Sequence, residues 1–181
     1  MQAFEFVMIL ISIILALGVK ELLAGVSRIL RGELRSYWVH SLWVVILFIM
    51  QLQYSWTLFD LEARETWVFL DLIRLLTPTV VLFLVSSLLF PERGESSDLS
   101  EFYFQICRPV FALLSGLMAY YTVLSLSLSV LTGIQAASTG ILFTLFCKSN
   151  PKTHQLVSPL YAAATLGFVA TYSYTLGESV F

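Results

Sequence analysis

Residues 6–19 read FVMILISIILALGV, and this uncharged stretch decides the fold class. With its apolar neighbours it reaches the length of about 20 residues that a helix needs to cross the hydrocarbon of a bilayer. Lys20 and Glu21 follow it without a small-residue cleavage site, and no basic segment precedes it. We therefore interpret the stretch as a first membrane span and not as a cleaved signal peptide.

The whole composition agrees with a membrane environment. The chain has 181 residues, of which 58% are hydrophobic and 12% charged, and its mean hydropathy is +0.85. Soluble domains carry about 25% charged residues, because charge is what covers a surface that faces water. The net charge of −2 also argues against a nucleic-acid partner, which would select a basic surface. The expected solvent is therefore the lipid bilayer.

Six apolar segments predict an all-α, polytopic protein, a six-helix bundle forming one integral membrane domain over residues 1–181. The expected spans are 4–29, 37–59, 66–90, 108–131, 133–146 and 156–176. Span 133–146 is short at about 21 Å, so a re-entrant segment is an alternative there.

Residues 98–106 predict an additional element before the fourth span. Asp98 followed by Glu101 resembles a capping box. Leu99, Phe102 and Ile106 then recur at helical spacing, which is typical of an amphipathic helix. We expect this helix to be separate and to lie on the membrane surface.

Basic residues predict the orientation, because they collect in cytoplasmic loops. Three alternate loops contain or adjoin them: Arg28, Arg31 and Arg35; Arg93 and Arg108; Lys148 and Lys152. The opposite side has only Arg64. We expect the loops 1–2, 3–4 and 5–6 to be cytoplasmic and both termini to be outside, in a plasma membrane of the bacterial inner-membrane type. This pattern also favours a true crossing by residues 133–146.

A polar cluster is expected in the hairpin of the second and third spans. Asp71 and Arg74 share a helix face at a spacing of three residues. A charge inside a membrane costs about 2.5–3.5 kcal/mol and needs a partner or a function. The hairpin places Gln51 level with Arg74 and Tyr54 level with Asp71, and Pro78 predicts a kink one turn further on.

Three interpretations of this cluster stay open. Asp71 and Arg74 form a structural ion pair, with Gln51 satisfying spare donors; or the cluster binds or conducts an ion or anionic solute; or it contacts another subunit. Lys20 and Glu21 form a second candidate. Lys20 can extend to the headgroups, while Glu21 pairs with Lys20 or Arg28, or acts as an inner gate.

Small residues at four-residue spacing predict close helix packing, within the subunit or between subunits. The packing candidates are Gly18, Gly25, Gly140, Ala163, Gly167 and Thr171.

No chemistry-bearing motif is found. His40, Cys107, Cys147 and His154 all map to cytoplasmic helix ends. A zinc site of these four is conceivable, but their spacing fits no compact zinc motif, so we expect no metal and no cofactor. H-E-x-x-H, G-x-S-x-G and phosphate-binding glycine loops are missing from the sequence, so we expect no enzyme.

Two functions are favoured by these observations. The first is a homo-oligomeric ion channel or small-solute transporter that uses the cluster of the second and third spans. The second is a non-catalytic accessory or assembly subunit of a larger membrane complex. An intramembrane enzyme is a third, weaker hypothesis.

Overall fold

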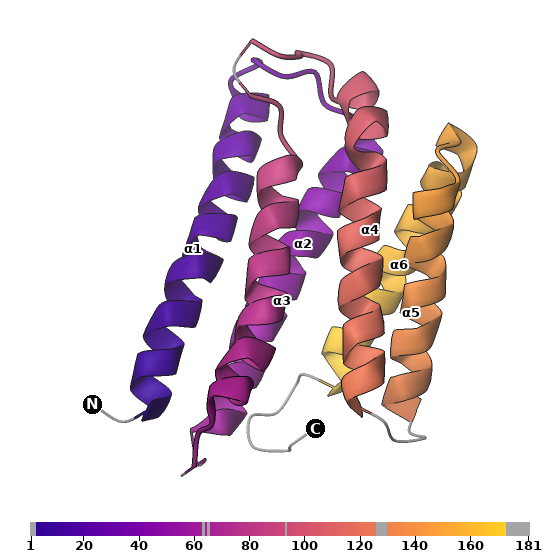
Figure 1. Ribbon diagram of the computed structural model, residues 1–181. Helices are drawn as coiled ribbons and strands as arrows, with labels where there is room; N and C mark the ends of the chain where they lie inside the picture. Colours follow the sequence, from indigo (N-terminus) through magenta and orange to yellow (C-terminus); the bar gives the residue numbers. More distant parts are fainter. Residues whose placement is uncertain (1–2, 63, 65, 93, 126–129, 173–181) are drawn as a thin grey trace.

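The computed structural model describes residues 3–62, 64, 66–92, 94–125 and 130–172. Its elements are helical: α1 (Ala3–Leu30), α2 (Trp38–Thr57), a 3-10 turn η1 (Leu58–Leu61), α3 (Phe69–Leu88), α4 (Leu99–Ser125), α5 (Val130–Cys147) and α6 (Pro151–Tyr172). Successive helices run in opposite directions along one common axis (Figure 1). The chain is therefore an all-helical bundle, as predicted.

Five of these helices, α1 to α5, are long and apolar enough to cross a membrane. The reason is visible in the sequence, since each consists of an apolar run bounded by polar or charged residues. α6 has 22 residues, but Pro151, Lys152 and His154 dilute its apolar character. The fold is that of a helical membrane protein.

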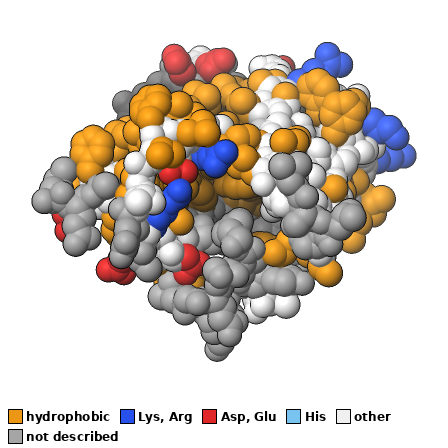
Figure 2. Space-filling model, turned by 60° about the horizontal axis from the view of Figure 1, so that its bottom comes forward, with side chains coloured by type: hydrophobic (Ala, Val, Ile, Leu, Met, Phe, Trp, Pro, Cys, Tyr) orange, Lys and Arg blue, Asp and Glu red, His pale blue; other side chains and the backbone are white. Residues whose placement is uncertain are grey.

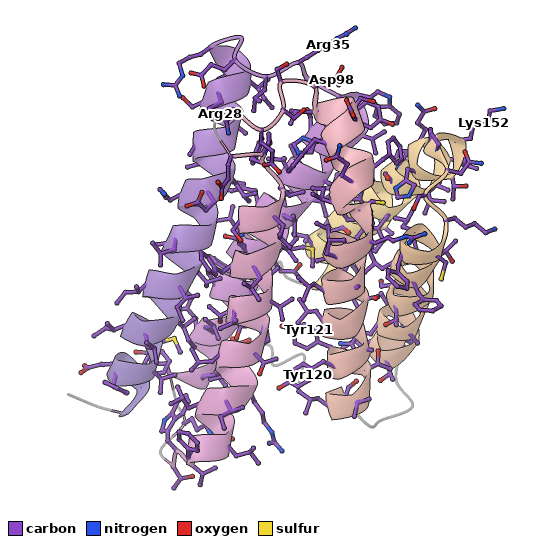
Figure 3. The ribbon with its side chains drawn as sticks, turned by 45° about the horizontal axis from the view of Figure 1, so that its top comes forward. Arg28, Arg35, Asp98, Tyr120, Tyr121 and Lys152 are labelled. Carbon is purple, nitrogen blue, oxygen red and sulfur yellow. The ribbon has the colours of Figure 1, made fainter. Side chains whose placement is uncertain are left out.

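The two ends of the bundle differ in charge and are named here by one residue each. The Arg28 end contains the last turns of α1, α3 and α5 and the first turns of α2, α4 and α6. The Arg74 end contains the opposite helix termini, with the α2–α3 linker. Arg28, Arg35 and Lys152 all lie at the Arg28 end, with Arg28 and Lys152 on opposite sides of the bundle (Figure 3).

The helices divide into a first half, α1–α3, and a second half, α4–α6. α1 packs mainly along α3, whereas α4 packs mainly along α5. α3 against α4 and α2 against α6 join the halves. Because the two halves pack in different ways, the structure has no sign of an inverted repeat in its described helices.

The expected surface helix 98–106 does not form a separate element. These residues form the first turns of the continuous helix α4, and Pro109 lies inside it. Leu99, Phe102 and Tyr103 are buried against the protein. The amphipathic pattern was real, but its apolar face packs on the bundle and not on lipid.

Other boundaries shift by a few residues. α4 is described to Ser125, and α5 begins at Val130, three residues before the expected start at 133. Residues 130 and 131, expected at the end of the fourth span, therefore belong to α5. α5 spans 18 residues, or about 27 Å, and is longer than predicted. α6 begins at Pro151, five residues earlier than predicted. The expected end of the sixth span, residues 173–176, lies outside the described residues.

A clasp of two loops closes the Arg28 end. The amide of Arg35 donates to the Ser97 carbonyl at 2.6 Å, and the amide of Leu99 donates to the Arg35 carbonyl at 3.1 Å. Gly32 and Gly94 turn these loops at φ 75° and 91°, a region that glycine enters without strain. The α1–α2 and α3–α4 loops are therefore held side by side (Figure 1).

Candidate functional site

A proline break in α3 organises the Arg74 end. Pro78 is buried inside α3 and has no N–H to offer the Arg74 carbonyl one turn earlier. The Tyr120 hydroxyl of α4 donates to that carbonyl at 3.3 Å. The next carbonyl, of Leu75, accepts the Tyr54 hydroxyl of α2 at 2.5 Å. Side chains of both neighbouring helices thus converge on the break.

Tyr54, Tyr120 and Tyr121 form a tyrosine cluster between α2, α3 and α4. The rings of Tyr120 and Tyr121 are 5.9 Å apart between centroids. Tyr54 is close enough to both to interact electrostatically. Tyr120 and Tyr121 lie on the side of α4 that faces α3 (Figure 3). The cluster therefore lines the interface between the two halves.

Asp71 does not form the ion pair with Arg74 that one of the three interpretations proposed. The Asp71 carboxylate pairs with Arg64 at 2.8 Å and also accepts the Val68 amide at 3.1 Å. Its side chain is 7% exposed. Arg64 also lies 5.3 Å from the centre of the Trp67 ring. Asp71 therefore caps the start of α3 and holds the α2–α3 linker, a structural role.

Arg74 is exposed in the second turn of α3. Its cation interacts with Asp71 only at longer range, as a nearby charge. Figure 2 looks onto the Arg74 end, whose surface is hollowed near the centre, with basic side chains at the edge of the hollow. Arg64 and Arg74 are the basic residues that the described segments bring to this end. The Asp71 carboxylate is thus bound to Arg64 and not to Arg74.

Gln51 does not join this site. It is 1% exposed, and its amide nitrogen donates to the Ser86 hydroxyl of α3 at 2.6 Å. Ser86 lies 12 residues beyond Arg74, so the expectation that Gln51 is level with Arg74 is wrong. The reason is that η1 prolongs the second span to Leu61 and α3 begins only at Phe69, and the two helices pack off the simple hairpin register.

Gly18 and Gly25 lie close to neighbouring residues of the first half. A Cβ on Gly18 would lie 3.1 Å from the Gln51 amide nitrogen, and one on Gly25 would lie 2.2 Å from the Phe90 ring. Gln51 is therefore clamped between α1 and α3. Its carbonyl oxygen is buried and has no hydrogen-bond partner among the described residues.

The remaining packing candidates are not packed. No atom of the described residues lies within 4 Å of a Cβ built on Gly140 or Gly167. Ala163 and Thr171 of α6 are also exposed. The small-residue faces of α5 and α6 therefore point away from the subunit.

Lys20 and Glu21 pair with each other at 2.7 Å, with side chains 68% and 38% exposed. Both lie in the second half of α1. Glu21 thus pairs with Lys20, one of the two partners considered for it.

A buried hydrogen-bond chain at the Arg28 end escaped the sequence interpretation. The Trp43 indole donates to the Ser158 hydroxyl at 2.9 Å, and the Ser158 side chain lies near the Tyr103 hydroxyl. The Tyr103 oxygen lies 2.7 Å from Nδ1 of His154. His154 Nε2 lies 2.8 Å from the Lys148 carbonyl, so it donates there and Nδ1 accepts from Tyr103. This chain joins α2, α4 and α6.

The two histidines and two cysteines do not form a zinc site. Among the described residues, no three His, Cys, Asp or Glu side chains are placed to hold a metal ion. His40 donates from Nε2 to the Leu89 carbonyl at 2.7 Å, while Cys147 is exposed. His154 is engaged by Tyr103. His40, His154 and Cys107 are buried and therefore serve helix packing.

No protein-family model, curated protein or solved structure matches the chain.

Proposed function

We propose that the chain is an integral membrane protein that binds a small anionic solute between its two halves and carries or conducts it across the bilayer. The solute enters at the Arg74 end. Arg74 supplies the charge, and the tyrosine cluster supplies hydroxyl groups and ring faces. The proposed role is non-catalytic.

One observation carries this proposal: Arg74 is exposed within a membrane span whose neighbouring carboxylate is bound to another arginine. An arginine at this depth is expected to cost about 2.5–3.5 kcal/mol, so an uncommitted one indicates a function. Guanidinium is also suited to carboxylate and phosphate groups, because its donors form two parallel hydrogen bonds. The preferred solute class is therefore a small carboxylate or phosphate.

The proline break supports movement at the same place. A helix that lacks one internal hydrogen bond bends at lower cost. The Tyr120 bond across the interface is long at 3.3 Å, so it is the weaker of the two hydroxyl contacts at the break. We propose that it opens and closes as the solute passes.

The proposed orientation places the Arg28 end in the cytoplasm of a bacterial cell. Arg28, Arg31, Arg35, Arg108, Lys148 and Lys152 all belong to that end. Arginine and lysine favour cytoplasmic loops. The Arg74 end then faces outward.

Flux into liposomes tests the proposal. Purified protein is reconstituted into vesicles, and uptake of radiolabelled phosphate, acetate, citrate and sodium is compared with protein-free vesicles. We expect saturable uptake of at least one of the anions and no uptake of sodium. Uptake of sodium in preference to every anion would contradict the role of Arg74.

The second candidate is an accessory subunit of a larger complex. The exposed small-residue faces of α5 and α6 favour it, because such faces let helices of different chains approach closely in a membrane. A homo-oligomer formed through the same faces fits the transport proposal. Affinity purification followed by mass spectrometry separates these cases. A heterologous subunit at fixed stoichiometry favours the accessory role, and a pure homo-oligomer favours transport.

A further inference from the structure

Beyond Glu101 in the first turn of α4, the described part of the second half carries only basic charges. Between Glu101 and Glu178 the charged residues are Arg108, Lys148 and Lys152. All three lie at the Arg28 end: near the start of α4, just after α5 and in the first turn of α6. All three are exposed. This end of the second half is therefore a net cationic surface.

The packing brings these cations around one turn. The Cys107 thiol beside Arg108 lies 3.6 Å from the Ser149 hydroxyl. His154 Nε2 donates to the Lys148 carbonyl at 2.8 Å and so folds the α5–α6 turn back on itself. This turn of α4 therefore lies level with the α5–α6 turn, and we name the three cations at this level the basic turn (Arg108, Lys148 and Lys152).

The described cations of the first half at this end, in contrast, have carboxylate partners. Arg31 pairs with Glu33 at 3.0 Å, and Arg35 lies 3.7 Å from the Asp98 carboxylate. For the basic turn, by contrast, no carboxylate among the described residues lies within 4.0 Å of a cationic nitrogen. Figure 3 shows the difference: Arg35 lies beside Asp98, while Lys152 projects away from the bundle. The basic turn thus lacks the internal anion that the other cations of this end have.

We propose that the basic turn binds the headgroup of an anionic phospholipid. The site lies at a helix end, at the depth where headgroups stand if the bundle spans the bilayer. Juxtamembrane lysines and arginines attract anionic lipids with about 1 kcal/mol each, and three cations around one turn add their fields.

The surface below the basic turn favours a lipid over a free phosphate ion. Leu156 and Leu160 follow Lys152 at intervals of four residues and are 68% and 64% exposed. Ala163 and Gly167 continue this exposed face toward the other end of α6. Directly below the cationic headgroup site, the two leucines offer an apolar contact for an acyl chain. The small residues further along α6 leave room for the rest of that chain.

Lipid binding in detergent tests the proposal. Purified protein is titrated with phosphatidylglycerol or phosphatidylcholine, and bound lipid is counted by native mass spectrometry. The test variant is Arg108→Gln, Lys148→Gln, Lys152→Gln. The matched control, Lys20→Gln, Arg31→Gln, Arg35→Gln, removes the same charge from residues that already have carboxylate partners.

The wild type should prefer phosphatidylglycerol to phosphatidylcholine. Each lost cation should weaken phosphatidylglycerol binding about fivefold, and the triple variant about hundredfold. The control should keep most of the preference. Equal binding of both lipids by the wild type would overturn the proposal, as would an unchanged preference in the test variant or an equal loss in the control.

Two further measurements keep the result interpretable. Lys152→Gln alone removes one exposed side chain and leaves the Lys148 carbonyl bond intact, so its expected fivefold loss does not depend on the triple variant folding. Inorganic phosphate is added as a competitor at a concentration matched to the lipid. Displacement of bound lipid by that phosphate would overturn the assignment to a lipid; retention supports it.

Discussion

The Tyr120 hydroxyl of α4 lies 3.3 Å from the carbonyl oxygen of Arg74 in α3, across the interface between the two halves. That carbonyl has no helical donor, because the residue four positions later is Pro78. A break in one helix is thus bonded by a side chain of another. The backbone carbonyl of Arg74 thus faces the second half, while its exposed guanidinium lies at the surface of the Arg74 end.

Replacing Tyr120 by Phe should loosen this interface. The variant leaves the Arg74 carbonyl without a donor, and such interhelical bonds in membranes contribute about 0.6 kcal/mol on average. We expect the free energy of unfolding in mixed detergent micelles to fall by about that amount. Tyr121→Phe is the matched control, since no described hydrogen bond involves its hydroxyl. An equal fall of the unfolding free energy in both variants would show that the hydrogen bond to the Arg74 carbonyl does not stabilise the protein.

Changes at Asp71 should separate its two bonds. Asp71→Asn keeps an oxygen for the Val68 amide but loses the ion pair with Arg64, whereas Asp71→Ala loses both. The midpoint of thermal unfolding is expected to fall in both, and further in the alanine variant. Arg74→Met should leave the midpoint unchanged. A larger fall of the unfolding midpoint in Arg74→Met than in Arg64→Met would contradict the pairing with Arg64 and favour an ion pair of Asp71 with Arg74.

The helices themselves could be predicted from the sequence, because apolar runs of membrane length leave few alternatives. The fate of residues 98–106 could not. A periodic apolar face indicates that something covers Leu99 and Phe102, but the same period results from lipid or from protein. Only the packing of α4 on the bundle decides between them.

For the candidate site, the sequence predicted which residues are involved but not which partners they have. Spacing identified Asp71, Arg74, Tyr54 and Pro78, since charge, hydroxyl and proline are conspicuous in an apolar helix. Spacing could not tell that Asp71 prefers Arg64 in the linker. The chain from Trp43 to His154 was missed because Trp43 and Ser158 are separated by 115 positions. No local pattern connects residues that meet only in the folded bundle.

Two glycines of the first half should resist enlargement. A methyl group at Gly25 meets the Phe90 ring, and one at Gly18 meets the Gln51 amide and the backbone of Phe83. Gly25→Ala and Gly18→Ala are each expected to cost about 1–3 kcal/mol of unfolding free energy. Gly140→Ala and Gly167→Ala, which meet nothing in the subunit, serve as controls. A larger loss in the controls, seen only in the oligomer, would assign α5 and α6 to an interface between chains.

Acid should destabilise the Arg28 end through His154. Burial lowers the pKa of His154 below its ordinary value of 6.5, against an opposing effect of its bond to the Lys148 carbonyl. Below pH 6.5 the unfolded chain therefore takes up a proton before the folded protein does, and the unfolding free energy falls as the pH drops toward the lowered pKa. Above pH 6.5 this contribution is complete. Unfolding of the wild type and of His154→Asn between pH 7.5 and 5 tests this, and equal slopes in both proteins would contradict it.

Anion uptake by Arg74→Met in liposomes tests the central claim most directly. Oligomeric state and unfolding midpoint are measured on the same preparation, with Arg64→Lys as the control because it retains a cation beside Asp71. The account predicts that Arg74→Met assembles and unfolds like the wild type and loses most of its anion uptake, while Arg64→Lys retains it. Full anion uptake by a normally assembled Arg74→Met protein would contradict the account.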